Sequence, residues 1–202
     1  MARVHADITI SLDGFVAGPN DGPGCGLGEG GERLHYWVFG GPWSYENPTS
    51  SESNSIDAEV LAGASEAGAV IVGRGMFDAG EAWGGKNPFD MPIFVLTNRI
   101  TDDLPADFTY VTGLDEALAQ ARAVAGDRTV AIGGGADVIQ QYLRAGVVDT
   151  LGIHIAPVVL GAGRPLFDGT FSADLRQLSC VQSPLATHLT YQVGGSGVSR
   201  TS

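Results

Sequence analysis

TVAIGGGADVIQQYLRAG, residues 129–146, is the stretch whose pattern says most about the fold. Residues 129–132 are a short apolar, β-branched run, three glycines (133–135) follow at once, and apolar residues then recur at helical spacing over 138–143 until Gly146. This order predicts a strand, a glycine turn and a helix. Glycines at such a junction allow a tight turn and leave N–H groups open at the helix N-terminus, where the helix dipole favours an anion. The turn indicates either a phosphate site or a tight connection without a ligand.

Two other apolar runs end in residues of the same kind. Residues 69–72 run into Gly73-Arg74, and residues 92–96 run into Thr97-Asn98-Arg99. In open α/β sheets, ligands bind beyond the carboxyl ends of the parallel strands. We therefore expect the three strand ends to meet at one edge of the sheet.

Outward from these strands, the alternation of strands and helices predicts an α/β fold, a three-layer α/β/α sandwich with a mostly parallel central sheet and a C-terminal antiparallel hairpin. No repeat or boundary divides the chain, so we expect a single domain over residues 1–193 and a disordered tail over 194–202. Expected strands cover residues 4–10, 69–72, 92–96, 108–111, 129–132, 150–159, 176–182 and 187–193. Expected helices cover 32–39, 56–66, 114–124 and the segment that ends at Gly146, and Ser55 is the expected cap of the second.

The composition bounds the function. The 202 residues carry a net charge of −12, which repels nucleic acid and anionic membranes, so an anionic ligand needs local arginines. No apolar run approaches the roughly 20 residues needed to cross a bilayer, and we expect a soluble cytoplasmic protein. Two cysteines, Cys25 and Cys180, argue against a disulfide framework. The four histidines show no metal-binding spacing, so we expect no metal site.

Residues 14–54 contain a turn-rich loop followed by dense aromatic residues. The loop is either a lid over a site or a solvated connection. The aromatics, which include Trp37 and Phe39, either cover the core or form the wall of a pocket for a flat substrate. Residues 26–31 match GxGxxG literally, but no strand precedes them, so we do not interpret them as a dinucleotide fingerprint.

Taken in order, the motifs resemble the dihydrofolate-reductase-like family. They are most similar to the branch that contains the C-terminal reductase domain of the bifunctional deaminase/reductase of riboflavin biosynthesis. The motifs that carry the resemblance are ITISLDGFVAGPND (8–21), VIVGRGMFD (70–78), PIFVLTNR (92–99), VAIGGGADVIQQYL (130–143) and APVVLGAGRPLF (156–167). Together they reach from the first strand to about residue 193.

The resemblance implies an NADPH-dependent reductase that transfers a hydride to a small heteroaromatic or imine-bearing substrate. The glycine turn would meet the cofactor pyrophosphate, and Arg74 or Arg99 would select the 2′-phosphate of NADPH, unless these are solvated surface arginines. Met76 stands where relatives often have a threonine. The cofactor residues implied are Ala17, Gly18, Gly73, Arg74, Met76, Thr97, Asn98, Arg99, Gly133, Gly134, Gly135, Ala136, Asp137 and Val138.

The resemblance also implies substrate-side residues. Asp57 lies near the place of the carboxylate that assists protonation in dihydrofolate reductases, although it equally suits the first turn of a helix. Asp13 is a substrate contact or, as we favour, a turn former before Gly14. Trp37 and Phe39 are the other candidate substrate contacts. Two alternatives remain, namely a dihydrofolate reductase and a non-catalytic nucleotide-binding dimeric protein. Relatives pair through the sheet, so we expect a homodimer.

Overall fold

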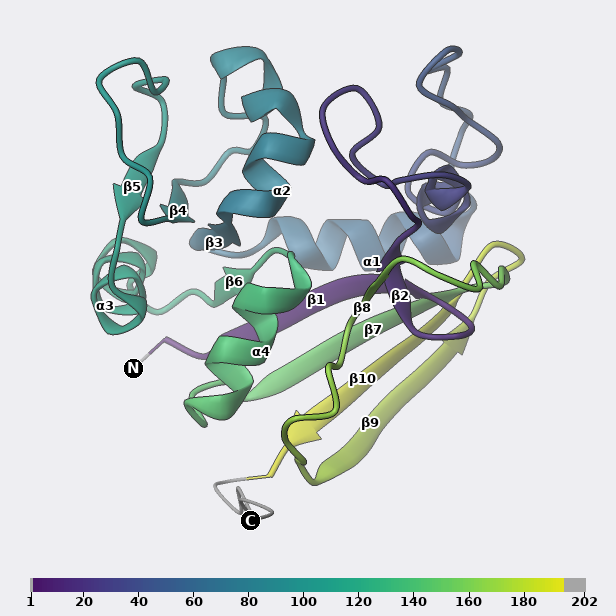
Figure 1. The fold of residues 1–202 in the computed structure, drawn as a ribbon. Helices are drawn as coiled ribbons and strands as arrows, with labels where there is room; N and C mark the ends of the chain where they lie inside the picture. Colours follow the sequence, from purple (N-terminus) through teal and green to yellow (C-terminus); the bar gives the residue numbers. More distant parts are fainter. Residues whose placement is uncertain (1, 195–202) are drawn as a thin grey trace.

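The computed structural model of the chain describes residues 2–194 and is built on an eight-stranded sheet with the order β5-β4-β3-β6-β1-β7-β10-β9 (Figure 1). The first six strands in this order, from β5 through β7, pair in parallel with their neighbours, whereas β10 is antiparallel to both β7 and β9. The predicted α/β fold with a mostly parallel sheet and a C-terminal hairpin is confirmed. The strands are β1 (Val4–Ser11), β3 (Ala69–Gly73), β4 (Ile93–Leu96), β5 (Thr109–Val111), β6 (Val130–Ile132), β7 (Thr150–Ala156), β9 (Leu175–Gln182) and β10 (Thr187–Val193).

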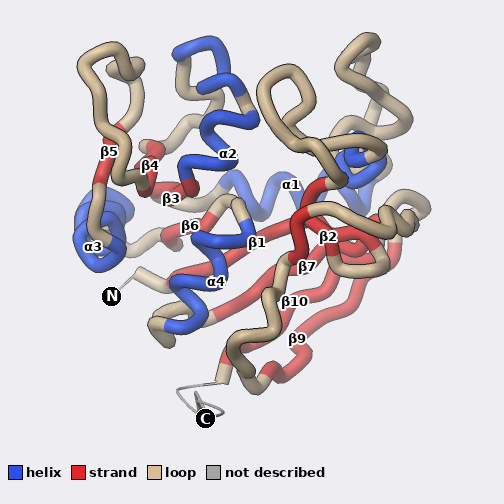
Figure 2. Tube along the Cα trace, viewed as in Figure 1, coloured by secondary structure: helices blue, strands red, loops and turns tan. Residues whose placement is uncertain are grey.

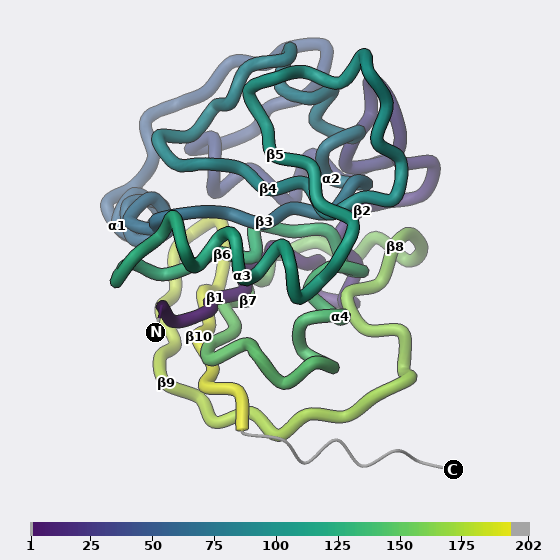
Figure 3. The backbone as a smooth tube through the Cα atoms, turned by 90° about the vertical axis from the view of Figure 1, so that its left-hand side faces the viewer, coloured from purple at the N-terminus to yellow at the C-terminus, as the bar shows by residue number. Residues whose placement is uncertain are grey.

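Helices lie on both sides of this sheet. Helices α3 (Leu114–Ala125) and α4 (Ala136–Arg144) pack on one side, whereas α1 (Ser55–Ser65) lies on the opposite side from α4 (Figures 1 and 3). Helix α2 (Arg74–Ala79) follows β3 directly, and η1 (Gly31–His35) and η2 (Glu81–Gly85) are short 3₁₀ segments. No helix within residues 2–194 is long and apolar enough to span a membrane.

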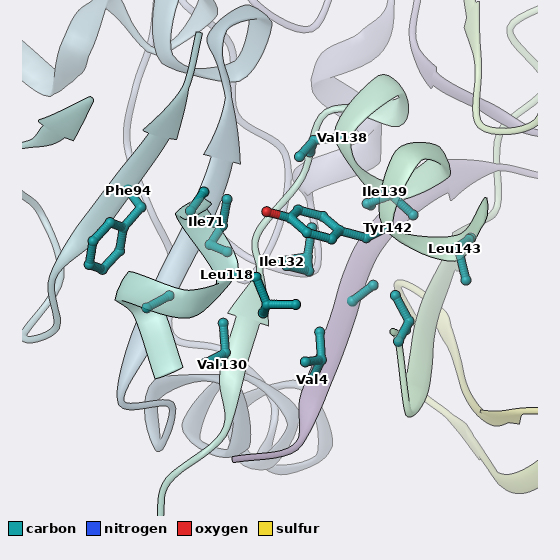
Figure 4. Packing of buried hydrophobic residues seen from close by; sticks show 14 of the residues in the cluster. Val4, Ile71, Phe94, Leu118, Val130, Ile132, Val138, Ile139, Tyr142 and Leu143 are labelled. Carbon is teal, nitrogen blue, oxygen red and sulfur yellow. The ribbon is translucent and has the colours of Figure 1, made fainter. Parts of the chain in front are cut away.

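The side of the sheet under α3 and α4 is a buried hydrophobic layer (Figure 4). Val4, Ile132 and Ile139 are fully buried there. Tyr142 is also fully buried, and its hydroxyl donates a 2.9 Å hydrogen bond to the carbonyl of Leu114, which ties α4 to α3. Burial of such apolar side chains is the main favourable term in folding, so this layer anchors the sheet from which the cleft rises.

The opposite side of the sheet is polar where β1, β7 and β10 run. Because successive side chains of a strand point to opposite faces, the residues that alternate with the apolar ones in β1 and β7 lie on the α1 side. Register then aligns them, since Thr9 pairs with His154 and His154 pairs with His188. Thr9, His154 and His188 are all buried. A row of polar side chains is therefore enclosed between the sheet and the segment that precedes and includes α1.

Helix α1 differs from the prediction in what it buries. Asn54, not Ser55, caps it, because the Asn54 side chain accepts hydrogen bonds from the backbone N–H groups of Ile56 and Asp57. Asp57 is the one buried residue of the helix, and none of its apolar side chains is buried. The helix therefore presents a carboxylate to the interior.

Several other boundaries also differ. The strand predicted over 150–159 ends at Ala156, and the helix predicted over 32–39 is reduced to η1. A small antiparallel sheet pairs β2 (Phe15–Ala17) with β8 (Arg164–Pro165), two segments outside the expected strands. Most of residues 18–54 is loop (Figure 2). The predicted tail begins at Gly194, whose N–H donates to the carbonyl of Asp174, and residues 195–202 lie outside the described residues.

Candidate active site

A cleft of about 810 Å³ opens at the carboxyl ends of the parallel strands. The three predicted strand ends, Gly73-Arg74, Thr97-Asn98-Arg99 and Gly133–Gly135, all line it. The volume falls within the roughly 300–1,000 Å³ typical of sites for small molecules and cofactors. We call the part of the cleft formed by the ends of β3, β4 and β6 the glycine half, and the part formed by β1, β7 and the adjoining β10 the histidine half.

In the glycine half, the backbone comes close to its neighbours at positions that only glycine tolerates. A Cβ atom on Gly133 would lie 2.6 Å from Cγ2 of Val70. Gly134 and Gly135 have φ angles of 121° and 89°, in the region that favours glycine. The turn delivers the chain to α4, whose first N–H groups have no side-chain cap. The N-terminus of α4 thus presents free backbone donors and a positive dipole end to the cleft.

The two arginines of the glycine half share one counter-ion. Nε of Arg74 lies 2.6 Å from Oδ1 of Asp78, and Nη2 of Arg99 lies 2.9 Å from Oδ2 of the same carboxylate. Arg74 also donates from Nη1 to the carbonyl of Arg99 at 2.7 Å. The Arg99 side chain is 67% exposed, whereas that of Arg74 is 21% exposed. Arg74 therefore holds the loop in place, and Arg99 is the guanidinium open to a ligand.

In the histidine half, four ionisable side chains stand in a chain. Asp57 Oδ1 lies 2.8 Å from His188 Nε2, and His188 Nδ1 lies 2.8 Å from His154 Nδ1. His154 Nε2 in turn lies 2.9 Å from Asp7 Oδ1, but neither of these two buried atoms meets hydrogen-bond geometry with any described residue. His154 and Asp7 line the cleft.

The charge states in this chain follow from its surroundings. Burial raises the pKa of the Asp7 carboxyl, but the imidazoles of His154 and His5 beside it lower that pKa more, so the net shift is downward and Asp7 is a carboxylate at neutral pH. Burial lowers the pKa of His188 by more than the neighbouring Asp57 raises it, so His188 is neutral there.

Trp37 packs against the two histidines of this chain. Its indole ring lies 4.5 Å from the His154 ring and 5.0 Å from the His188 ring, centroid to centroid. Its Nε1 donates to Oγ1 of Thr9 at 3.0 Å, which fixes the ring. Trp37 is only 4% exposed, so it keeps water from the contact between the two imidazoles while its edge lines the cleft.

The predicted site residues divide into those that line the cleft and those that do not. Ala17, Gly73, Arg74, Met76, Thr97, Asn98, Arg99, Gly133, Gly134, Gly135, Ala136, Asp137, Val138 and Trp37 line it. Four predicted residues, Gly18, Asp13, Phe39 and Asp57, are not among the lining residues.

Each of these four has another place. Asp13 accepts hydrogen bonds from the N–H groups of Leu160 and Gly161. A hydrogen bond with the Ser11 side chain, together with these two smaller contributions, lowers the pKa of the Asp13 carboxyl to about 2. Gly18 packs against the carbonyl of Glu29: a Cβ atom at position 18 would lie 2.1 Å from the Glu29 carbonyl oxygen. The Phe39 ring packs on the Trp43 ring, with the two ring centroids 4.6 Å apart. Asp57 is fully buried against His188 and reaches the cleft only through the histidines.

Sequence reasoning missed Asp7, His154 and His188. A signal for them exists in the strands. A parallel strand covered on both faces is expected to be a continuous apolar run. In β1 and β7, however, His5, Asp7 and His154 alternate with apolar residues. Alternation inside a doubly covered sheet indicates a buried polar layer.

Comparison with known proteins identifies the family. The model of the RibD C-terminal domain matches residues 2–189. The chain belongs to the RibD C-terminal domain family. None of the curated proteins compared with the chain matches it.

Solved structures share the fold of this family member. A protein named for riboflavin biosynthesis from Shewanella sp. PV-4 aligns with a TM-score of 0.70 at 24% identity, over 96% of this chain and 99% of that one. A pyrimidine reductase-like protein from Corynebacterium diphtheriae aligns with a TM-score of 0.66 at 16% identity, over 96% and 93%. Dihydrofolate reductase from Enterococcus faecalis, in a complex with NADP(H), aligns with a TM-score of 0.57 at 14% identity, over 95% and 96%.

Proposed function

We propose that this chain is an NADPH-dependent reductase that transfers a hydride to a C=N or C=O bond of a small planar heterocycle. The observation that carries the proposal is the convergence of three glycine- or arginine-bearing strand ends on one cleft. A dinucleotide needs two kinds of contact, backbone donors for its pyrophosphate and a cation for a 2′-phosphate, and the glycine half offers both.

The residues of the glycine half fit the cofactor. Gly134 to Val138 would hold the pyrophosphate, because the turn brings bare backbone to the cleft and α4 begins there without a side-chain cap. Arg99, exposed beside Thr97 and Asn98, would hold the 2′-phosphate. When bound, the cofactor supplies a hydride from C4 of its nicotinamide ring.

The substrate side falls to the histidine half, where Asp7, Trp37 and His154 line the cleft. No observation favours dihydrofolate reduction, since Asp57, the carboxylate on which that alternative depends, is buried away from the cleft lining. The loop residues Gly26, Leu27 and Val38 also line the cleft, so the segment 18–54 contributes to its shape and to substrate selection.

Calorimetry and absorbance test the proposal together. NADPH should bind the purified chain with measurable heat and more tightly than NADH, and its absorbance should fall in the presence of one of a panel of heterocyclic imines and carbonyls. Replacement Gly134→Val should abolish the heat, whereas Gly63→Ala, on α1 with open space around it, should not. Binding without turnover across the panel would instead favour a nucleotide-binding protein, and the absence of any heat with wild-type protein would refute the proposal.

We also propose a homodimer formed through β9. All eight residues of this edge strand are exposed, and Leu175, Leu178 and Val181 are 40–49% exposed. Edge strands with apolar side chains need a cover, and a second copy of the same strand supplies one. Light scattering should give the mass of two chains, and Leu178→Lys should give the mass of one. A monomeric wild-type protein would refute the dimer without affecting the reductase proposal.

A further inference from the structure

The chain Asp57–His188–His154–Asp7 connects the buried side of α1 to the cleft. Its three contacts measure 2.8, 2.8 and 2.9 Å. The side chains of Asp57, His188 and His154 are 0%, 5% and 7% exposed, whereas the Asp7 side chain is 23% exposed and lines the cleft. Burial of ionisable groups costs free energy unless they are paired, so a buried chain that ends at a candidate active site points to a functional role.

Asn54 fixes the direction of this chain. Its Oδ1 accepts hydrogen bonds from the N–H groups of Ile56 at 3.1 Å and Asp57 at 3.0 Å, so its amide nitrogen is the end that points at Oδ2 of Asp57 and donates to it. Asp57 thus accepts on Oδ2 from Asn54 and on Oδ1 from His188, as an ionised carboxylate does. His188 therefore carries its proton on Nε2.

The position of the next proton follows. A neutral imidazole has one protonated nitrogen, so Nδ1 of His188 is a bare acceptor. The proton in the contact between the two Nδ1 atoms then belongs to His154. Of the four ring nitrogens of His154 and His188, only Nε2 of His154, beside the Asp7 carboxylate, is free of a hydrogen bond within the chain of four residues, so it is the nitrogen that can gain or lose a proton.

We propose that Asp57 and His188 are positioning residues that hold a proton on Nδ1 of His154. Nε2 of His154 and the Asp7 carboxylate then take up and deliver the proton that reduction in the cleft consumes. This inference rests on the proposed reductase function. Asp7 is the group of the chain that meets the substrate, because its side chain is 23% exposed whereas the Nε2 atom of His154 is buried.

The proton balance of the step is simple. As the carbon of a C=N or C=O bond accepts a hydride, its nitrogen or oxygen gains an electron pair and needs a proton. In the reacting state His154 carries a proton on both ring nitrogens. Its Nε2–H bond breaks and the proton passes to Asp7, which leaves His154 neutral with its proton on Nδ1. The O–H bond of Asp7 then breaks as the new N–H or O–H bond of the substrate forms. The reduced nicotinamide nucleotide is the two-electron donor and is oxidised, the substrate is reduced, and water in the cleft returns a proton to Asp7 and His154.

Gly152 is what allows Asp7 to reach His154. A Cβ atom at position 152 would lie 2.1 Å from Oδ1 of Asp7, so any larger residue displaces the carboxylate. Asp7 pairs with Gly152 across β1 and β7, in the row next to Thr9 and His154. The carboxylate therefore lies over the glycine and against the imidazole. Gly152→Ala is a purely steric way to separate Asp7 from His154.

Nitrogen NMR of the wild-type protein, labelled with ¹⁵N-histidine and free of cofactor, is the first test. We expect a scalar coupling across the hydrogen bond between His154 Nδ1 and His188 Nδ1, with the proton covalently bound to His154. We also expect His188 to be protonated on Nε2. A proton bound to His188 Nδ1 would overturn the inference.

The variant Asp57→Asn reverses the chain in a predictable way. Asn54 still presents its NH₂ group to residue 57, so the new amide turns its oxygen to Asn54 and its own NH₂ to His188. His188 must then accept on Nε2 and donate from Nδ1, which moves the proton of His154 to Nε2. NMR should show both tautomers exchanged, whereas Glu59→Gln, an exposed charge change on the same helix, should leave them as in the wild type.

Kinetics supply the second readout. With a substrate that the wild type reduces, Asp57→Asn and Gly152→Ala should lower kcat by about 10²-fold, the scale of general acid–base catalysis, with little change in KM for NADPH. The dependence of kcat on pH should also differ from that of the wild type in both variants. Normal kcat and pH profile in folded Gly152→Ala protein would overturn the inference.

The two proposals fail in different ways. If no cofactor is oxidised at all, the reductase proposal fails, while the tautomers of the free protein still test the order of protons. If the wild type is an active reductase but Asp57→Asn changes neither the tautomers nor kcat, the proton route fails and the reductase stands.

Discussion

The glycine half and the histidine half of the cleft are built from opposite materials. The glycine half offers backbone N–H groups and an uncapped helix start, held by residues that have little or no side chain. The histidine half offers buried side chains, held by strand register and by one another. A site made of backbone depends on local conformation, whereas a site made of buried side chains depends on every partner in the chain.

The largest effect is expected in the histidine half. Asp57→Ala should lower the free energy of unfolding by about 3 kcal/mol, the upper end of the cost of an unpaired buried donor, because it leaves the Nε2–H group of the buried, neutral His188 without a partner. In the glycine half, Arg74→Ala removes a partly exposed ion pair and should cost about 1 kcal/mol or less. Urea unfolding measures both. Equal losses would remove the distinction between the two halves.

Gly134→Ala probes the backbone site. The φ angle of 121° at this position is one that alanine rarely adopts, and its Cβ atom would lie 3.1 Å from Sδ of Met76. We expect a loss of about 1–3 kcal/mol in unfolding free energy, the cost of one strained residue. NADPH affinity, measured by calorimetry, should fall while the ¹⁵N spectrum of His154 and His188 stays unchanged. A change in that spectrum would show that the halves are coupled.

Arg99→Ala sharpens the assignment of the phosphate site. Arg99 is the exposed member of the arginine pair, and a charged hydrogen bond contributes about 1.5–3 kcal/mol. NADPH affinity should fall by roughly 10-fold or more, with NADH affinity unchanged. Binding isotherms for both nucleotides give the ratio. An equal loss for the two would place the 2′-phosphate elsewhere.

Acid should act first through histidines. Burial lowers the pKa of His35 from 6.5 to about 4, and it also lowers that of His188. In this window the unfolded chain binds protons that the folded chain does not, so stability is full above pH 6.5 and falls as the pH drops toward 4.

The downward shift at Asp7 adds a further loss below pH 3.8. His35→Gln should reduce the loss of unfolding free energy between pH 6.5 and 4 by about 1 kcal/mol. The effect is this small because the residue is only partly buried and solvent screens its charge. Urea midpoints across pH measure this. A wild-type midpoint that stays constant between pH 6.5 and 4 would contradict the assignment of buried neutral histidines.

The sequence predicted the glycine half well because its determinants are local. A β-branched run, three glycines and a helical period are all read within residues 129–146, and the same logic applies to Gly73-Arg74 and residues 97–99. The histidine half escaped prediction because its members lie far apart in the sequence, with Asp57 and His188 131 positions apart. Only the register of β1, β7 and β10 brings Asp7, His154 and His188 together.

Asp57 shows the same limit in a single residue. Its position near the start of a helix was predicted, but its partner was not, because helix periodicity gives the apolar face and α1 buries a carboxylate instead. The N-cap was likewise displaced by one residue, since Asn54 and Ser55 are both good caps and the side chain of Asn54 also contacts that of Asp57 in the first turn.

Asp78 has a consequence for how tightly the cleft retains a phosphate. Because this one carboxylate bridges both guanidinium groups, any phosphate that reaches Arg99 exchanges one anion for another instead of meeting an unbalanced cation. The gain on association is the difference between two ion pairs, and Asp78 stands ready to reclaim Arg99 when the nucleotide departs. On the proposed function, Arg99 should therefore release the spent cofactor faster than an arginine without a resident anion.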